Sequence, residues 1–394
     1  MQKRLPKRLK SLVDGMKKKI LITATELNLV QFWVAHIENL IKSGCTVDIV
    51  CSDVGGKLSE LKARLQSCGN PQITVVDLKR SPLSPHNIRG AAQMKRYLNG
   101  RDYDLILTNE PVMGMVTRFA ASKKRRSGCK VIYFAHGFHF WRGAPALNWM
   151  LFYPLEKLAS YFTDAIVTMN REDFELAKKS FGSAEIKYIH GIGVNLSKFK
   201  FSKEIREKKR KELGVGEDDV MIFSANELTK RKNVFLALEA VKLLVSGGMT
   251  NIKYFIRGQG PLQKEMQEYI NNNKLQKNVF LLGYGKDIAE MDSAADVFLF
   301  TSKQEGLPVA VMEAMAQELP CVVSDIRGVT DLIQNGSGGY VCRLKDAKGF
   351  ADAVKRVISE GGRGSNLTRG NSQKLADYEI SSVSRSIINI LQEI

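Results

Sequence analysis

The chain has 394 residues, 44% apolar and 25% charged, a composition typical of a globular protein with room for two or three domains. It has no run of about 18 apolar residues, which excludes a membrane-spanning helix, and no apolar stretch follows the basic N-terminus, which excludes a signal peptide. The six cysteines are scattered without a C-x-x-C pair, which fits a reducing cytoplasm and neither a zinc nor a disulfide framework.

The net charge of +18 is unevenly distributed. Residues 1–195 carry 30 Lys and Arg against 16 Asp and Glu, with basic clusters at 1–19 and 123–130. This asymmetry favours an anionic partner, either nucleic acid or anionic lipid, near which each basic residue contributes ~1 kcal/mol. A solvated basic face is the alternative interpretation. Because the sequence contains no nucleic-acid recognition motif, we predict an anionic membrane surface and no nucleic acid.

From residue 19 onward, buried-strand patterns alternate with helical patterns through the first half. The expected strands are 19–25, 45–50, 73–78, 104–109, 129–136, 164–170 and 185–194. The expected helices are 30–43, 57–66, 88–98, one from 112, and 147–162. Strands that alternate with helices of about ten or more residues imply βαβ units and a parallel sheet.

The same alternation restarts in the second half. The expected strands are 220–225, 252–258, 278–283, 296–301 and 321–325, with a helix between each pair, a further helix at 203–211 and a helical tail at 372–394. The sequence therefore predicts two doubly wound α/β domains, 17–195 and 196–375. A basic extension, 1–16, precedes them, and a C-terminal helix, 376–394, follows.

The segment 302–325, SKQEGLPVAVMEAMAQELPCVVSD, carries two carboxylates, Glu305 and Glu313. Pro308 suits the first turn of a helix, so Glu305 is expected in the loop after a strand and Glu313 in the next helix. In open α/β sheets ligands bind at this edge. A carboxylate accepts hydrogen bonds from both hydroxyls of a vicinal diol. The alternative interpretation is two helix-start carboxylates that the helix dipole favours.

In this context the words EGLP, EAMA and PCVV, with E-x7-E, resemble the donor site of retaining glycosyltransferase family 4. That resemblance spans about residues 19–394 and is strongest over 279–334. It implies the GT-B fold, in which two Rossmann-like domains face a cleft and the C-terminal helix crosses back to the N-terminal domain. It also implies that Glu313 holds the nucleotide ribose and Glu305 the donor sugar, with Gly306 and Leu307 beside them.

The loop 226–233, NELTKRKN, corresponds to the phosphate-binding loop of the family. There the family pattern is Gly-Arg followed by Lys, both cations holding the diphosphate. Lys232 matches the Lys, but Asn226 and Glu227 stand at the Gly-Arg positions. Arg231 or Lys230 is therefore expected to supply the missing cation. An exposed basic cluster is the alternative interpretation of these residues.

Two further words belong to the same predicted site. In IRGQGPL, Gly258 and Gly260 follow a strand and precede a helix, where glycine allows a close backbone approach and a helix N-terminus favours anions. By resemblance, this loop lines the nucleotide. Tyr284, in LLGYGKDI, is expected to pack on a uracil-like base, although an ordinary loop tyrosine explains it equally well.

His136, in KVIYFAHGFHFW, follows a buried strand and can bind a sugar hydroxyl. The resemblance places it opposite the donor sugar and implies that the leaving phosphate, and not this histidine, takes the acceptor proton. A capping or core histidine is the alternative. His139 lies three residues on, but no third ligand is near in sequence, so we predict no metal site.

For the acceptor, the segment 23–31 has none of the glycines common at this loop in the family, and its contacts would come from Thr25, Glu26 or Asn28. Aromatic residues gather near the expected cleft, where they suit a sugar face or a bilayer surface, although core positions are the commoner role. They are Phe32, Trp33, Phe138, Phe140, Trp141, Trp149, Phe152 and Tyr153.

Together these features predict a cytoplasmic glycosyltransferase on the inner face of the membrane. It would transfer a sugar with retention from a nucleotide diphosphate sugar, most simply a UDP-sugar, to a lipid-diphosphate-linked glycan in exopolysaccharide or capsule assembly, with no cofactor or metal. Two alternatives stay open. One is a nucleotide-sugar epimerase of the same plan. The other is a weak or inactive partner subunit, suggested by Glu227, the glycine-free segment and Glu318 where relatives often have Gly.

Overall fold

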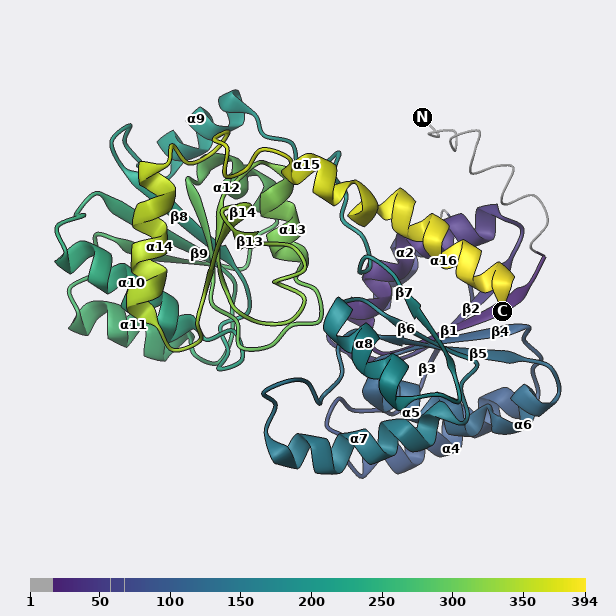
Figure 1. The fold of residues 1–394 in the computed structure, drawn as a ribbon. Helices are drawn as coiled ribbons and strands as arrows, with labels where there is room; N and C mark the ends of the chain where they lie inside the picture. The colour runs from purple at the N-terminus through teal and green to yellow at the C-terminus, as the bar shows by residue number, and fades with distance from the viewer. Residues whose placement is uncertain (1–16, 57, 67) are drawn as a thin grey trace. The chain divides into compact units, whose positions relative to one another are not determined.

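The computed structural model describes residues 17–394 apart from 57 and 67, so the predicted basic extension lies outside the described residues. The chain forms two compact units (Figure 1). The N-terminal unit runs to Gly193 and includes 380–394, and the C-terminal unit comprises Val194–Glu379. The sequence predicted the boundaries after Asn195 and between residues 375 and 376.

The N-terminal unit is built on a seven-stranded parallel sheet in the order β3-β2-β1-β4-β5-β6-β7. Its strands are β1 (Lys19–Glu26), β2 (Thr46–Val54), β3 (Ile73–Val75), β4 (Leu105–Asn109), β5 (Lys130–Ala135), β6 (Ala165–Thr168) and β7 (Glu185–Tyr188). Its helices are α2 (Leu27–Lys42), α3 (Leu58–Gln66), α4 (His86–Asn99), α5 (Pro111–Ala120), α6 (Ser122–Arg126), α7 (Ala146–Ser160), α8 (Arg171–Ser180) and α16 (Ile380–Glu393). The chain turns back between β1 and β4, which makes this edge the topological switch point.

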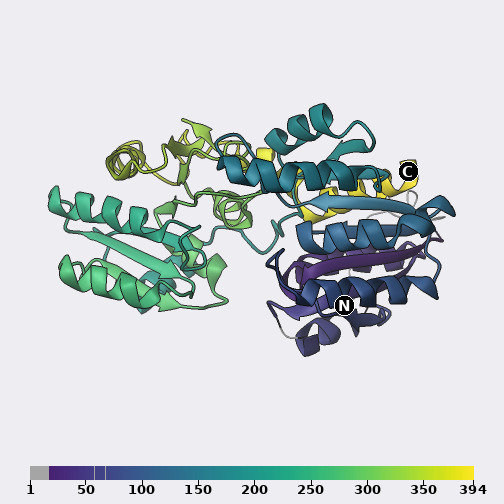
Figure 2. The ribbon, with the colours of Figure 1, turned by 90° about the horizontal axis from the view of Figure 1, so that it is seen from below.

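Helices cover both faces of this sheet. Seen from below, α4, α5 and α7 lie side by side over one face (Figure 2). They bury apolar residues such as Met94 and Met113 against Leu21 and Val131 of the sheet. Helix α2 packs on the opposite face, and the C-terminal helix α16 packs on α2.

The C-terminal unit has a second seven-stranded parallel sheet, in the order β10-β9-β8-β11-β12-β14-β13. Its strands are β8 (Val220–Ala225), β9 (Ile252–Arg257), β10 (Val279–Gly283), β11 (Val297–Phe300), β12 (Cys321–Ser324), β13 (Gln334–Asn335) and β14 (Gly338–Cys342). Its helices are α9 (Lys203–Glu212), α10 (Val234–Ser246), α11 (Gln263–Asn272), α12 (Ile288–Ala294), α13 (Val309–Ala316), α14 (Ala347–Ser359), α15 (Asn371–Lys374) and the 3-10 turn η1 (Leu375–Tyr378). The predicted doubly wound plan is confirmed in both units.

The C-terminal helix returns to the N-terminal unit, as predicted, through a buried polar contact. His36 of α2 bonds Ser384 of α16 through Nδ1 at 2.8 Å and the carbonyl of Ile192 through Nε2 at 2.8 Å. Because a carbonyl only accepts, Nε2 carries the proton and Nδ1 accepts from the serine hydroxyl. The predicted single tail helix is broken: η1 ends at Tyr378 and Glu379 is extended before α16 begins.

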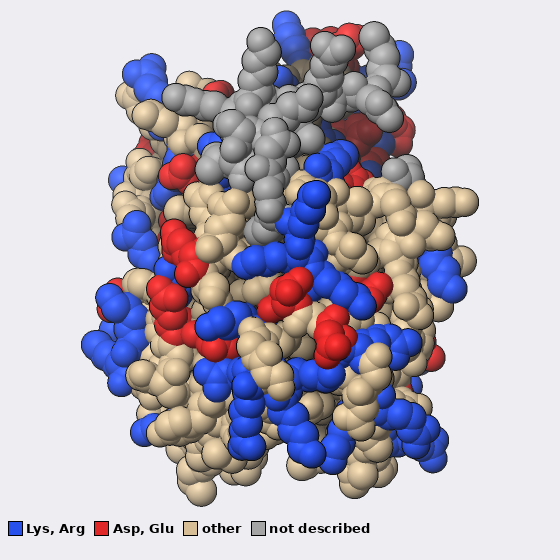
Figure 3. All heavy atoms as spheres, turned by 90° about the vertical axis from the view of Figure 1, so that its right-hand side faces the viewer, with Lys and Arg blue, Asp and Glu red and all other residues tan. Residues whose placement is uncertain are grey.

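None of the helices that the structure describes is long and apolar enough to cross a bilayer. Lys and Arg side chains are prominent on the side of the N-terminal unit that carries α6 (Figure 3). Several of them pair with carboxylates, as Lys124 does with Asp102 at 2.7 Å and Arg125 with Asp164 at 2.9 Å. The basic cluster at 123–130 is therefore a partly neutralised surface built around the short helix α6.

Candidate functional site

Glu305 lies in the loop between β11 and α13, where the sequence placed it, and binds both predicted cations. Its Oε1 accepts from Lys232 Nζ at 2.7 Å, from Arg231 Nη1 at 3.2 Å and from Ser302 Oγ at 2.6 Å. Two positive groups thus meet one carboxylate at the carboxyl edge of the sheet. We call Glu305, Lys232 and Arg231 the Glu305 cluster, and its two cations can donate charged hydrogen bonds to an anionic ligand.

The loop that carries the two cations is held against the loop of Glu305 by further hydrogen bonds. The Thr301 hydroxyl donates to the Lys232 carbonyl at 3.2 Å, and the amide of Lys303 donates to the Arg231 carbonyl at 2.9 Å. Glu227, which replaces the expected arginine, lies 3.6 Å from Arg231 Nη2. The negative charge of Glu227 is therefore partly compensated by Arg231, the residue that the sequence predicts as a substitute for the missing arginine.

Glu313 lies in α13, as predicted, and its surroundings differ from those of Glu305. Its carboxylate makes no hydrogen bond or ion pair with the described residues, and burial raises its pKa to about 7, with Lys198 opposing the shift. The N-terminus of α13 has no side-chain cap either, so its first amides are open to a ligand. A desolvated acceptor beside free helix amides matches the prediction for a ribose site, which stays a prediction.

Asp292 of α12 is a carboxyl group that the sequence did not single out. It is fully buried, and neither carboxyl oxygen has a hydrogen-bond partner among the described residues. Burial, with the nearby Glu313 as a second cause, raises its pKa well above the usual range. Both causes favour the protonated form of Asp292, and its position within an ordinary helical pattern gave no sign of this.

The glycines of the loop after β9 have a packing reason. A Cβ at Gly258, whose φ is 151°, would lie 1.8 Å from the carbonyl oxygen of Asn226, and one at Gly260 would lie 2.5 Å from that of Leu228. They let the cation-bearing loop pass closely across this edge. Gly306 is approached in the same way, since a Cβ at Gly328 would lie 1.9 Å from its carbonyl oxygen.

The other predicted site residues of this unit, Leu307 and Tyr284, differ in their exposure to solvent. Leu307 packs against the core of the C-terminal unit. Tyr284 follows β10 and is 68% exposed. The predicted contact of Tyr284 with a base therefore depends wholly on a ligand, because the protein leaves its ring in solvent.

In the N-terminal unit, His136 follows β5 and its ring is oriented by Asn109 at the end of β4. His136 Nε2 lies 2.8 Å from Asn109 Oδ1, while Asn109 Nδ2 donates to the carbonyl of Thr23 at 3.1 Å. The amide oxygen of Asn109 can therefore only accept, so Nε2 of His136 carries a proton. Burial lowers the pKa of His136 to about 4, which keeps the ring neutral and Nδ1 unprotonated. His136 consequently offers a ligand an acceptor at Nδ1.

The segment 23–31 forms no loop, contrary to what was expected. Strand β1 runs to Glu26, and α2 begins at the next residue. Glu110 fixes this turn, accepting from the amides of Thr25 at 2.7 Å and Glu26 at 3.0 Å. Its φ of 62° and ψ of 156° are strained for a residue with a side chain, and burial raises its pKa to about 7. The sequence gave no signal for this strained carboxyl at the switch point.

Most of the aromatic residues near the expected cleft belong to the core or pack against it, which is the commoner of the roles that the sequence left open. Trp33, Phe138 and Phe140 are buried, and the latter two form a core cluster against which Trp149, Phe152 and Tyr153 pack. Phe32 is exposed. Helix geometry accounts for this, since α7 turns its aromatic side chains toward the core cluster and its aliphatic side chains toward solvent.

With this geometry in view, comparison with known proteins identifies the chain's family. Residues 30–197 match the family model "Glycosyltransferase Family 4", and residues 205–374 match "Glycosyl transferases group 1". The putative glycosyltransferase EpsD of Bacillus subtilis (strain 168) is 34% identical over 284 residues, which are 72% of this chain and 74% of EpsD. The chain belongs to glycosyltransferase family 4. The predicted family and enzyme class are thereby confirmed.

Other family 4 relatives and solved structures are more distant. A protein of Escherichia coli named UDP-Gal:alpha-D-GlcNAc-diphosphoundecaprenol alpha-1,3-galactosyltransferase is 28% identical over 278 residues, 70% of this chain and 71% of that protein. The crystal structure of Anabaena Alr3699/HepE in complex with UDP and glucose aligns with a TM-score of 0.78 at 17% identity, covering 96% of this chain and 100% of that one. This likeness confirms the GT-B fold of the family 4 chain.

Proposed function

We propose that this family 4 enzyme transfers a sugar, with retention, from a UDP-sugar to a lipid-diphosphate-linked glycan during bacterial surface polysaccharide assembly, working at the inner face of the membrane. The observation that carries the proposal is the Glu305 cluster together with the unpaired Glu313 in the same unit. Support comes from the Escherichia coli relative, whose name gives a UDP-sugar donor and a diphosphoundecaprenol-linked acceptor, and from a solved structure with UDP-glucose.

In this proposal, each residue of the C-terminal unit has a separate task. Glu313 accepts hydrogen bonds from the ribose hydroxyls, and the carboxylate of Glu305 accepts from hydroxyls of the donor sugar. Lys232 and Arg231 stabilise the negative charge that develops on the leaving diphosphate. No side chain of the Glu305 cluster is required as a base, because the departing phosphate takes the acceptor proton.

In the N-terminal unit, His136 is the residue proposed to bind the donor sugar, and Asn109 orients its ring. Since Asn109 fixes the proton on Nε2, Nδ1 of His136 accepts a hydrogen bond from a sugar hydroxyl. Substrates that lack this hydroxyl leave a buried acceptor unpaired, which is a strong basis for discrimination. His136 is therefore a specificity residue in this scheme.

Calorimetric titration with UDP tests the donor site, with GDP and ADP as competitor nucleotides. We expect selective UDP binding that Glu313→Ala weakens at least tenfold, because loss of the acceptor leaves ribose donors unpaired at a cost of ~1–3 kcal/mol. Glu268→Ala, an exposed carboxylate of α11 in the same unit, is the matched control and should leave affinity unchanged. If no nucleotide binds, the catalytic proposal is wrong and the inactive-partner alternative takes its place.

A further inference from the structure

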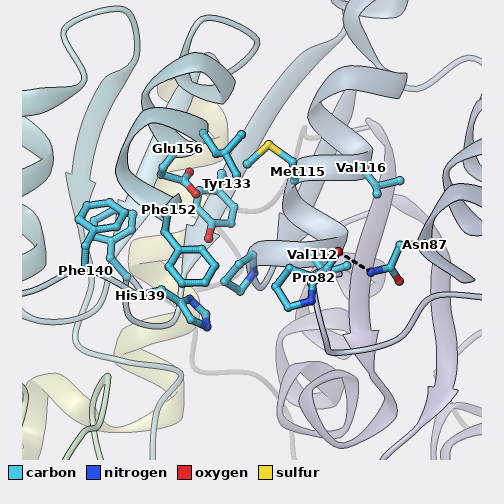
Figure 4. Close-up of a pocket in the computed structure, with 13 residues that line it drawn as sticks. Pro82, Asn87, Val112, Met115, Val116, Tyr133, His139, Phe140, Phe152 and Glu156 are labelled. Atoms are coloured by element: carbon cyan, nitrogen blue, oxygen red, sulfur yellow. Dashed lines mark hydrogen bonds between the residues drawn. The ribbon is translucent and has the colours of Figure 1, made fainter. Parts of the chain in front are cut away.

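A hollow in the N-terminal unit, between α5 and α7, is unused by the proposed chemistry (Figure 4). It measures about 190 Å³ and is partly open to solvent, so it is smaller than the roughly 300–1,000 Å³ of a whole ligand site and suits part of a narrow chain rather than a compact ligand. Its wall is mainly apolar, formed by residues such as Val112, Met115, Phe152 and Leu155. We propose that this hollow binds the isoprenoid chain of the lipid that carries the acceptor glycan, an inference that rests on the proposed function.

The mouth of the hollow lies beside the residues proposed to meet the sugar. Pro111 and Val112 follow directly after the end of β4 and Glu110, and Phe138 and His139 follow His136 after β5. Carboxyl ends of parallel strands share one edge of a sheet, which is where ligands of this fold class bind. A lipid chain in the hollow would therefore leave its attached diphosphate and sugar at the acceptor edge of the same unit.

The floor of the hollow carries charge, but that charge is paired internally. Glu156 accepts from Arg118 Nη1 at 2.5 Å, and both side chains are buried. The guanidinium of Arg118 also lies 4.1 Å from the ring centroid of Tyr133, and Glu156 lies beside that ring in the hollow (Figure 4). The carboxylate is thereby compensated, so the floor accepts a hydrocarbon without leaving a bare charge under it.

The outer side of α7 extends the apolar wall into solvent. Leu147, Met150, Leu151, Leu155 and Leu158 are 50–71% exposed and follow the three-and-four spacing of one helix face. Leu155 belongs both to this stripe and to the hollow. A contiguous exposed apolar face of this kind marks a binding surface rather than ordinary surface composition.

The charges around the stripe favour an anionic lipid over a second copy of the chain. Helices α4, α5, α6 and α7 contain a single acidic residue, Glu156, and it is buried. Their exposed charges are all positive: Arg89, Lys95, Arg96, Lys123, Arg126 and Lys157. Two such faces would repel each other, whereas an anionic bilayer attracts basic groups and accepts leucines.

A second hollow, between α4 and α5, continues the first. The two share Met115 and Val116, and the second reaches Lys95, Lys123 and Lys124. The two hollows thus adjoin at Met115 and Val116 of α5, and the second has basic residues in its lining. This arrangement suits a long chain that passes from the first hollow along α5 toward an anionic bilayer.

Calorimetry with farnesyl diphosphate, a short isoprenoid diphosphate, tests the inference. Saturating UDP is included so that the donor site cannot take the diphosphate. We expect binding to the full chain, at least tenfold weaker binding to Met115→Trp, which fills the first hollow, and to Leu155→Glu, which places a charge at its rim. Leu243→Glu, an exposed leucine of α10, is the matched control and should bind normally.

The outcomes separate this inference from the proposed function. Inorganic diphosphate under the same conditions reports binding of the head group alone, and equal binding of both ligands would overturn the inference. UDP titration and thermal unfolding of each variant show whether the donor site and the fold survive. UDP binding without farnesyl diphosphate binding overturns the inference alone, even if phosphatidylglycerol vesicles bind, whereas loss of UDP binding in the unsubstituted chain overturns the proposed function.

Discussion

At the scale of single residues, the Asn109–His136 pair makes a prediction that does not depend on the substrate. Nitrogen NMR of His136 should report a neutral ring protonated at Nε2 at pH 7, because Asn109 can only accept there. Asn109→Asp should raise the pKa of His136 by one unit or more, since a carboxylate within hydrogen-bond distance favours the charged ring. Asn99→Asp, on the exposed side of α4, is the control. A ring protonated at Nδ1 in the unsubstituted protein would contradict the assignment.

Glu313 predicts how nucleotide binding depends on pH. Its pKa is raised to about 7 by burial, so half of the carboxyl groups are protonated near neutrality. If only the carboxylate accepts from both ribose hydroxyls, UDP affinity should rise as the pH increases from 6 to 8. Glu313→Gln should bind more weakly and lose this dependence. A parallel slope in both proteins would assign the titration to another group, such as the phosphate of UDP.

The sequence could point to candidate site residues only where they belong to a short, recognisable sequence motif. Glu305, Lys232 and Glu313 were predicted as site residues because spacing and neighbouring residues place them in the loops and the helix that follow strands. Ser302 and Asn109 escaped notice because hydroxyl and amide groups at strand ends are common, and only the tertiary structure shows what they bind. The strained backbone of Glu110 likewise has no sequence signature in a residue other than glycine.

At the scale of secondary-structure elements, the contact between α2 and α16 predicts a pH-dependent stability. Burial lowers the pKa of His36 to about 4, below its ordinary value near 6.5. The neutral ring therefore contributes stability that is complete above about pH 6.5 and is lost as the pH falls through about 4. Thermal unfolding should show that the melting temperature falls more steeply between pH 7 and pH 4 for the unsubstituted protein than for His36→Gln.

The same variant should also be less stable at pH 7 by about 1–3 kcal/mol, because Ser384 and the Ile192 carbonyl lose a well-placed partner. His86→Gln removes an exposed histidine that bonds Asp77 and serves as the control. If both substitutions change stability equally at pH 7, the buried contact has no special role in holding α16.

Most long periodic elements were predicted, but the helices α8 and α14 were missed despite their length, and so were the shortest strands. The strands of both sheets appear within a few residues of their expected positions because fully buried strands read as apolar runs. Strand β13 has two residues and β14 begins with Gly338 and Gly339, so neither has an apolar run. A Cβ at Gly339 would lie 1.8 Å from the Cys321 carbonyl oxygen, which explains a glycine at this position by sheet pairing. Glu318 has a φ of 56°, a backbone conformation that glycine adopts more readily, which gives a conformational reason for the glycine that the family resemblance implies there.

At the scale of the whole molecule, the chain's path divides it into units that sequence order alone does not define. Residues 380–394 follow the entire C-terminal unit yet belong to the N-terminal one. Their helix buries Val383, Ile387, Ile388 and Leu391. Each buried aliphatic side chain contributes roughly 1.5–3 kcal/mol, so α16 is a substantial part of the stability of a unit that lies far from it in sequence.

Removal of the chain after Glu379 should therefore destabilise the N-terminal unit selectively. Hydrogen exchange followed by mass spectrometry should show faster exchange in α2, which loses the packing of α16, and in β1, on which α2 packs, and unchanged exchange in α10, α11 and α14 of the C-terminal unit. Ile387→Asp, which leaves the chain length intact, should give the same pattern, and Ser386→Asp on the less buried side of α16 should not. Equal acceleration in both units would mean that they unfold as one cooperative body and that the division of the chain at Glu379 has no energetic meaning. A selective effect would establish that the last helix is an integral part of the N-terminal unit.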